Sequence, residues 1–189
     1  MDFSFTAEQE DLRREARMFL EAAVLFEELG RVLYDGPYIA NEVGEDRRQQ
    51  LAAHALEAVG IGSRAVEMAI AYIGEREQFG KKIGTYQAVS HPVVDAYVAV
   101  ELARSLAYWA ALCVTTGDVQ ADVACAAANA QATEAAVLAC ETSIQVHGGI
   151  GFTFEHPLHR YYKRALELEG ALGYGRELRA EIAEFLLHS

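Results

Sequence analysis

The chain has 189 residues, of which 52% are hydrophobic and 23% charged, a balance that suits one globular domain and excludes a disordered chain. Its 28 acidic and 16 basic side chains give a formal net charge of −12, which repels nucleic acid and anionic membrane surfaces. We therefore exclude nucleic acid and membranes as its main partners. An anionic cofactor can still bind locally through one or two arginines and helix N-termini.

Apolar residues at helical spacing, bounded by capping and turn signals, predict a succession of helices. The expected helices cover residues 6–20, 24–33, 46–77, 86–115, 119–146, 157–169 and 176–187. Thr6 and Gln9 have the spacing of a capping box at the start of the first helix, and Tyr34-Asp35-Gly36-Pro37 is a turn sequence that ends the second. Residues 38–45 are expected to form a connecting loop, and residues 80–84 a turn.

Three of these helices carry patterns that predict how they pack. Gly60 and Gly62 cost the third helix roughly 1 kcal/mol each relative to alanine, so we expect a neighbouring helix to approach closely there. The fourth helix has a stripe of large apolar residues that is expected to face the core: Val94, Val98, Leu102, Leu106, Trp109 and Cys113. The fifth has a comparable face, rich in small residues, that favours close packing: Val123, Ala127, Ala130, Val137 and Ile144.

The pattern contains almost no strands, so the predicted fold class is all-α, an antiparallel helix bundle. We divide the chain into N-terminal helical segments at residues 1–45 and a C-terminal domain resembling a four-helix bundle at residues 46–189. From this pattern we expect no apolar run of membrane-spanning length. We accordingly expect a bundle whose apolar helix faces pack on one another and on other subunits.

Cysteine usage and the N-terminus indicate the compartment. Cys113, Cys125 and Cys140 lie in alanine- and valine-rich stretches without a C-x-x-C pair, so we expect buried free thiols and no cysteine metal site. Residues 1–5 lack the basic and apolar regions of a signal peptide. Both features predict a cytoplasmic protein, since free thiols persist in a reducing compartment.

Two stretches of the chain resemble a known family. Residues 75–91, EREQFGKKIGTYQAVSH, resemble the C-terminal domain signature of the acyl-CoA dehydrogenases. Residues 145–157, QVHGGIGFTFEHP, are similar to the second signature of that family, and residues 1–20 and 25–40 resemble pieces of its N-terminal helical domain. A lone R-x-x-F-G or G-G-x-G usually marks only the end of a helix. The two together, in the order and at the separation of the family, are far more specific.

The resemblance implies FAD as the cofactor, held mainly by a neighbouring subunit and touched by both signatures along its adenosine and pyrophosphate part. The residue types suit this role. A guanidinium forms directional bonds to phosphate, an aromatic ring offers apolar area beside adenine, and glycines let backbone N–H groups approach an anion. The residues that the resemblance assigns to the cofactor or its supporting turn are Arg76, Phe79, Gln87, Gln145, Gly148 and Gly149.

The chain departs from the family in two respects. The family's middle β-domain, which covers one face of the flavin, has no counterpart between Gly44 and Asp46, and much of the N-terminal helical domain is missing too. The base that takes the α-proton of the acyl-CoA is expected at Leu172, or near Gln50 on the first long helix of this domain, and neither residue accepts a proton. Glu169 also precedes a glycine and can serve only if the loop is shorter by three residues.

The resemblance gives this chain residues that contact the cofactor, but no domain that covers the flavin and no clear base. This combination predicts a subunit rather than a self-sufficient enzyme. We expect it to contribute FAD contacts to an acyl-CoA dehydrogenase-like flavoprotein, in a homo- or hetero-oligomer whose substrate is an acyl-CoA. Two alternatives stay open: a minimal active dehydrogenase with Glu169 as base, and a non-catalytic helix-bundle dimerisation module that has lost cofactor binding. We expect no metal, because His147, His156 and His159 lack the carboxylate–histidine spacing of known sites.

Overall fold

A computed structural model describes residues 7–34, 36 and 38–188, with the side chains from residue 19 onward except that of Ala40. It confirms the predicted all-α bundle. The helices are α1 (Ala7–Val32), α2 (Tyr38–Val43), α3 (Arg47–Glu75), α4 (Gln87–Thr116), α5 (Ala121–His147), α6 (Leu158–Ala171) and α7 (Gly175–His188). The remaining elements are the strands β1 (Glu77–Gln78) and β2 (Lys81–Lys82) and the 3-10 helices η1 (Ile83–Thr85) and η2 (Gly148–Phe152).

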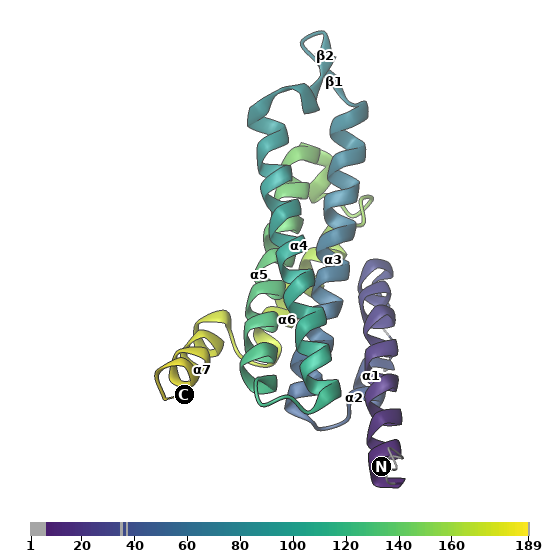
Figure 1. Ribbon diagram of the computed structural model, residues 1–189. Coiled ribbons are helices and arrows are strands. Elements are labelled where there is room, and N and C mark those ends of the chain that lie inside the picture. Colours follow the sequence, from purple (N-terminus) through teal and green to yellow (C-terminus); the bar gives the residue numbers. More distant parts are fainter. Residues whose placement is uncertain (1–6, 35, 37, 189) are drawn as a thin grey trace, which may run out of the picture.

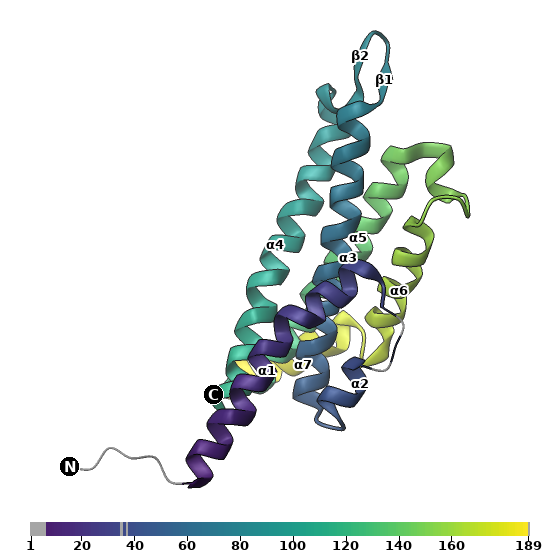
Figure 2. The ribbon, with the colours of Figure 1, turned by 90° about the vertical axis from the view of Figure 1, so that its right-hand side faces the viewer.

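The long helices α3, α4 and α5 lie side by side and form the body of the bundle (Figure 1). Helix α1 crosses this body obliquely, and α6 packs along α5 on another side (Figure 2). The β1–β2 hairpin projects from one end, where α3 stops and α4 begins. The second signature stretch, at the end of α5, therefore lies toward the same end of the bundle as the first.

The N-terminal segments differ from their predicted outline. The two helices expected over residues 6–20 and 24–33 are one continuous helix, because Glu21-Ala22-Ala23 between them contains no residue that breaks a helix. The loop expected over residues 38–45 contains the short helix α2, whose Val43 is buried in the core. Thr6 of the expected capping box lies outside the described residues, as do Asp35 and Pro37 of the expected turn.

Helix α3 matches its prediction closely. It begins after Asp46, whose side chain accepts a hydrogen bond from the backbone amide of Arg48 at 2.9 Å, a normal N-cap contact. The helix runs unbroken through both of its central glycines and ends at Glu75. The turn expected over residues 80–84 is instead a two-residue hairpin turn at Phe79-Gly80, followed by β2 and η1.

The expectation for Gly60 and Gly62 is confirmed. Helices α1 and α3 cross where Gly30 faces the backbone of α3 and Gly60 faces the backbone of α1. A Cβ at Gly60 would overlap the carbonyl oxygen of Glu27. A Cβ at Gly30 would likewise overlap the carbonyl oxygen of Glu57. At Gly62 a Cβ would lie 2.8 Å from a methyl carbon of the Val100 side chain on α4. Gly60 and Gly62 are thus both sites of close helix approach.

The stripe predicted to bury α4 faces outward, and this expectation was wrong. Leu102 is 59% exposed and Val94 is 53% exposed, whereas Cys113 alone of the stripe is fully buried. The buried face of α4 consists of small residues, namely Ala96, Val100, Ala103, Ala107 and Ala110. Small side chains let α4 approach α3 and α5 closely, so the large apolar ones are left on the opposite face. Helix α5, by contrast, is buried on nearly every side, with Ala130 and Ile144 in the core.

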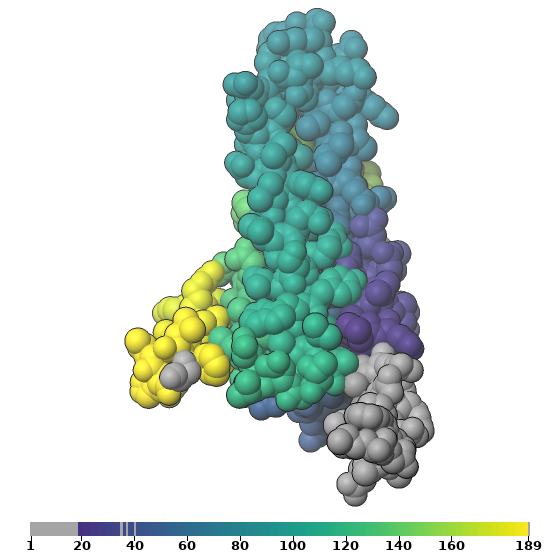
Figure 3. Space-filling model, in the orientation of Figure 1, coloured from purple at the N-terminus to yellow at the C-terminus, as the bar shows by residue number. Residues whose placement is uncertain are grey.

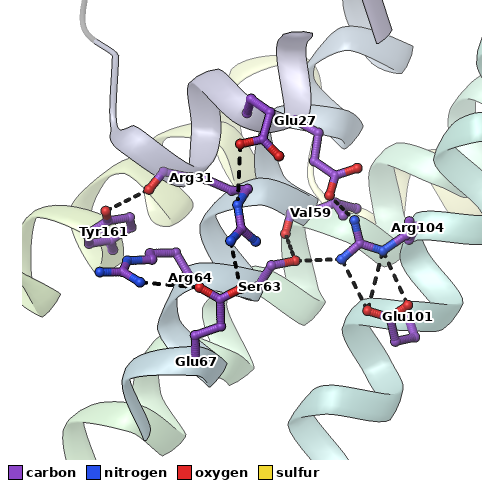
Figure 4. A network of polar contacts seen from close by, with 10 residues as sticks. Glu27, Arg31, Val59, Ser63, Arg64, Glu67, Glu101, Arg104 and Tyr161 are labelled. Carbon is purple, nitrogen blue, oxygen red and sulfur yellow. Dashed lines mark hydrogen bonds and ion pairs between the residues drawn. The ribbon is translucent and has the colours of Figure 1, made fainter. Parts of the chain in front are cut away.

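A buried polar network joins α1 to α3 and α4 (Figure 4). Arg104 pairs with the carboxylate of Glu27, whose side chain is 9% exposed, and donates to the Ser63 hydroxyl at 2.8 Å and to Glu101 at 3.1 Å. The Tyr108 hydroxyl donates to the other oxygen of Glu27 at 3.0 Å. Burial lowers the pKa of Arg104 from its ordinary value, yet the surrounding acceptors keep it paired. Glu27 is therefore the acceptor on which the network converges.

Replacing Glu27 with glutamine is expected to destabilise the protein by about 2–3 kcal/mol, because Arg104 loses its most buried counter-charge and Tyr108 loses an ionised acceptor. Urea denaturation followed by circular dichroism measures the change. The matched control is Glu28→Gln, one residue along α1, where the side chain is 59% exposed and the expected change is below about 0.5 kcal/mol. Equal effects of the two substitutions would contradict the assigned role of Glu27.

The cysteines behave as expected from the sequence. Cys113, Cys125 and Cys140 are buried free thiols. Burial raises the pKa of Cys125 and of Cys140 to about 12, so both stay protonated and unreactive at neutral pH. We assign all three to core packing.

Helices α4 and α5 are long and apolar enough to cross a membrane, by length and composition alone, which differs from the absence of spanning runs expected from the sequence. Two-thirds of the most apolar part of the second span is buried inside the bundle. A helix buried among other helices needs apolar residues on all sides, which accounts for its hydropathy. Burial does not account for the hydropathy of α4, because its large apolar residues face outward.

Candidate cofactor-binding site

The first signature stretch forms the hairpin and its anchor. Phe79 and Gly80 both adopt left-handed conformations, with φ of 53° and 76°, which closes a two-residue turn between β1 and β2. Such a conformation strains a residue other than glycine by roughly 1–2 kcal/mol. Phe79 is nevertheless an aromatic residue there, and its side chain is 92% exposed. Strain that holds an apolar ring in solvent at a hairpin tip points to a contact outside the chain.

The hairpin is fixed to the end of α3 and the start of α4. The backbone amide of Ile83 donates to the carbonyl of Arg76 at 2.8 Å, and the Tyr86 hydroxyl donates to the carbonyl of Gln78 at 3.3 Å. The Lys81 ammonium lies 4.1 Å from the centre of the Tyr86 ring, a cation–π contact. Arg76 is the C-cap residue that follows α3, and it is exposed at the base of the hairpin. These contacts hold the hairpin, and with it Phe79, in a fixed position relative to α3 and α4.

The second signature stretch ends α5 and forms η2. Gly148 has φ 64° and ψ −137°, a conformation that is open essentially only to glycine, and it terminates the helix. A Cβ at Gly151 would lie 2.7 Å from the carbonyl oxygen of Ile144, so this glycine is needed for packing. A Cβ at Gly149 would meet nothing within 4 Å. Gly149 thus has no packing reason within the described residues, and its exposed backbone is open to an approaching group.

One cavity of about 710 Å³ lies between the hairpin, the start of α4 and the last turns of α5. It brings together Phe79 of the first signature and Gln145 of the second, 66 positions apart in sequence. Its walls are mainly apolar, and the one charged residue lining it is Glu141. The other lining residues are Gln78, Ile83, Tyr86, Ala88, Val89, Pro92, Leu138, Thr142 and Val146. A largely apolar slot of this size with an aromatic ring at its rim suits a flat heterocycle.

The other residues that the resemblance assigned to the cofactor do not line this cavity. Arg76 and Gln87 are exposed beside the hairpin, and Gly148 and Gly149 are exposed at the end of α5. The structure therefore gathers four of the six near the cavity without placing them in its wall, and their roles stay predictions. Leu138 and Glu141 were not identified from the sequence. Leu138 lies seven and Glu141 four residues before Gln145, on the same face of α5, and this spacing was the available signal.

A second cavity, of about 280 Å³, lies between α2, α3 and α6. Both positions at which the family's base was expected, Gln50 and Leu172, line it, although they are far apart in the chain. Glu57 and Arg164 also line it, and the guanidinium of Arg164 donates to both carboxylate oxygens at 2.7 and 3.0 Å. Glu169 lies half-buried on α6 and does not line either of these two cavities.

Two histidines of the second signature form an aromatic stack with Tyr72 of α3. The ring of His147 lies 4.4 Å from that of Tyr72 and 4.5 Å from that of His156, measured between ring centres. His147 is held by a 2.7 Å contact between its Nδ1 and the carbonyl oxygen of Ser143. In the part of the chain that the structure describes, no group of three or more potential ligands is arranged to hold a metal ion. The stacked rings connect Tyr72 of α3 to the end of α5 and to the segment that follows η2.

Stability is expected to fall as the pH drops through about 6.5, where histidines of the unfolded chain take up protons. Burial lowers the pKa of His156, with smaller contributions from His147 and His159, and burial also lowers the pKa of His54. The unfolded state therefore binds more protons in the window below 6.5, which favours unfolding. Urea denaturation at pH 7.5 and 5.5 measures the loss, and His156→Gln is expected to reduce it. An unchanged loss in that variant would contradict the assignment.

Comparison with known proteins places this chain in one family. Residues 47–187 match the model of the acyl-CoA dehydrogenase C-terminal domain. The chain is 40% identical over 152 residues to acyl-CoA dehydrogenase FadE34 of Mycobacterium tuberculosis, an alignment that covers 78% of this chain and 21% of that protein. It is 35% identical over 132 residues to acyl-CoA dehydrogenase IpdE2 of Mycolicibacterium smegmatis, covering 68% of this chain and 40% of that protein.

Solved structures agree with this assignment. The ChsE4–ChsE5 complex from Mycobacterium tuberculosis aligns with a TM-score of 0.71 and 31% identity, over 76% of this chain and 39% of the matched chain. Glutaryl-coenzyme A dehydrogenase in complex with glutaryl-CoA aligns with a TM-score of 0.72 and 30% identity, over 78% of this chain and 38% of the other. The chain thus spans at most about two fifths of these relatives. It belongs to the acyl-CoA dehydrogenase family, within which it matches the C-terminal helical domain.

Proposed function

We propose that this chain contributes FAD contacts to an acyl-CoA dehydrogenase-like flavoprotein and that a partner subunit completes the flavin site. The reaction would be the α,β-dehydrogenation of an acyl-CoA thioester. The observation that carries the proposal is the cavity of about 710 Å³ that Phe79 and Gln145 line together. This cavity unites the two signatures at the end of the bundle from which the hairpin projects.

The residues around this cavity fit the adenosine and pyrophosphate part of FAD. Adenine would lie against the apolar walls and the Phe79 ring, because a flat heterocycle gains most from apolar and aromatic contact. The pyrophosphate would lie outside the cavity, away from the Glu141 carboxylate, where Arg76 offers a guanidinium and Gly149 an open backbone. When bound, the flavin supplies the acceptor for the hydride. This chain's residues then bind and orient it.

The outward face of α4 supports oligomeric assembly. Its large apolar residues, on one side of the helix, are 37–59% exposed: Val94, Tyr97, Val98, Leu102, Trp109 and Leu112. Helix α4 runs down the front of the molecule in Figure 3, and no other described element covers this part of it. Contiguous apolar surface of this kind is typical of a protein–protein interface. We propose a homo- or hetero-oligomer with an acyl-CoA dehydrogenase subunit, in the cytoplasm.

Two weaker proposals come from the same residues. In one, the chain is itself a minimal dehydrogenase with Glu169 as base, which requires that helix α6 or its loop bring Glu169 to a substrate. In the other, the bundle is a dimerisation module without cofactor, and the α4 face is its main functional surface. The dimerisation proposal leaves the strained, exposed Phe79 without a role, so we favour the flavin subunit.

The test is the replacement of Arg76 with alanine in the complex formed with a co-expressed acyl-CoA dehydrogenase subunit. We expect FAD affinity to fall at least about tenfold, which corresponds to about 1.4 kcal/mol and to the loss of one charge-assisted contact to phosphate. Flavin retained per complex after gel filtration measures it. The matched control is Arg176→Ala on α7, another exposed arginine, which should retain flavin fully. Unchanged retention in Arg76→Ala would refute the proposal and favour the dimerisation module.

A further inference from the structure

The cavity between α2, α3 and α6 has a chemical composition that the proposed flavin contacts do not explain. It is lined by residues of this chain, among them Gln50, His54 and Glu57 from α3 and Arg164 and Leu172 from α6 and its end. A volume of about 280 Å³ holds a short acyl chain with its thioester, although not the whole of CoA. The two positions at which the family resemblance led us to expect a base both line this cavity.

Among the groups that line the cavity, most are engaged or cannot accept a proton. Both oxygens of Glu57, which is 3% exposed, accept hydrogen bonds from Arg164 at 2.7 and 3.0 Å. The Gln50 amide donates to the carbonyl of Gly44 at 2.7 Å and is not a base. Leu172 is apolar. A carboxylate tied to a guanidinium by two bonds is a poor proton acceptor, because protonation would break the pair.

His54 differs from these groups. It is the only imidazole among the described residues that line the cavity, and its Nδ1 is buried without any hydrogen-bond partner. A buried polar atom that lacks a partner is uncommon and calls for an explanation, of which a catalytic role is one. Burial lowers the pKa of His54, so the ring is neutral near pH 7 and can accept a proton. Glu57, three residues along the same helix, favours the imidazolium that would result, while Arg164 opposes it.

We propose that His54 replaces the missing carboxylate of this cavity and accepts the α-proton of a short acyl-CoA thioester. The inference rests on the acyl-CoA part of the proposed function. In this step the Cα–H bond breaks, the proton passes to an imidazole nitrogen, and the electron pair remains on the thioester as its enolate. In D₂O the imidazolium exchanges its proton with solvent and returns a deuteron to Cα. This exchange needs no electron acceptor, so atoms and electrons balance without the flavin.

The experiment is incubation of the full chain with butyryl-CoA in D₂O, followed by mass spectrometry of the recovered thioester. We expect α-deuterium to enter at least tenfold faster than in buffer alone, and His54→Gln to lower that rate at least tenfold. The matched control is His91→Gln, an exposed histidine near the start of α4, which should exchange like the wild type. The proposal is overturned if His54→Gln exchanges as fast as the wild type. It is also overturned if the wild type exchanges no faster than buffer alone.

Two further variants separate a chemical role from a structural one. Leu172→Glu in the His54→Gln background places a carboxylate on the wall of the same cavity and is expected to restore exchange, which a merely misfolded variant would not show. Glu169→Gln should exchange at the wild-type rate, and loss of exchange in that variant would return the base role to Glu169 and overturn the proposal. Flavin retention by Arg76→Ala is a separate readout. If Arg76→Ala retained its flavin while exchange still depended on His54, only the proposed flavin contacts would be refuted.

Discussion

Replacing Gly60 with alanine is expected to destabilise the protein by about 3 kcal/mol, at the upper end of the cost of overpacking a core. The added methyl would overlap the carbonyl oxygen of Glu27. That oxygen belongs to the backbone of α1, so no side-chain rotation relieves the overlap and the two helices must separate. Gly30 repeats the same contact from the other side, which doubles the constraint on the crossing. We expect α1 to detach in part, with loss of the Glu27–Arg104 pair.

The matched control for Gly60→Ala is Gly74→Ala in the same helix. A Cβ at Gly74 meets nothing within 4 Å, and its φ is not in the left-handed range. Alanine is a better helix former than glycine, so this substitution is expected to stabilise the protein by up to about 1 kcal/mol. Urea denaturation of both variants measures the difference. Effects of the same sign and similar size would contradict the account of the α1–α3 crossing.

The second large effect is expected at the ion pair between α3 and α6. Replacing Arg164 with methionine is expected to cost about 3 kcal/mol, because it leaves the Glu57 carboxylate, with a side chain 4% exposed, without its partner. Replacing Glu57 with glutamine is expected to cost only about 1 kcal/mol. The guanidinium left behind is 40% exposed, reaches water, and keeps its 3.2 Å contact with Glu167.

The asymmetry between these two substitutions is the measurable quantity. Urea denaturation at pH 7 of Arg164→Met and Glu57→Gln gives the two free energies of unfolding. Replacement of the exposed Arg47, which pairs with Glu181 at 2.8 Å, is the control and should cost less than about 1 kcal/mol. Equal costs for Arg164→Met and Glu57→Gln would show that burial of the carboxylate does not govern this pair.

The end of a helix could be predicted where a residue at that end has a side chain suited to capping. Asp46 has a side chain suited to capping and precedes a long run of helix formers, so the start of α3 was readable from residue types. The buried face of α4 was not. Periodicity finds two apolar faces on that helix, one of large residues and one of alanines, and cannot tell which packs inward. The close approach of α3 and α5 selects the alanines, and that approach is a property of the tertiary structure.

The candidate site, like the helices, could be predicted from the sequence only in part. The order of the two signatures indicated that they act together, and Phe79 and Gln145 do line one cavity. The strain at Phe79 could not be foreseen, since it follows from a two-residue turn at Phe79-Gly80, whereas the sequence pattern predicted a turn that begins at Gly80. His54 carried no signal either. Its meaning depends on Gln50 and Leu172 lying on the same cavity, a contact between α3 and the end of α6.

We propose that this chain supplies one side of a flavin site that another subunit completes. The most direct measurement is the visible absorption spectrum of the purified chain, alone and after co-purification with an acyl-CoA dehydrogenase subunit from the same organism. We expect a colourless chain alone and a yellow complex with a flavin spectrum. A chain that carries stoichiometric FAD by itself, or a stable complex that stays colourless when FAD is added, would contradict it.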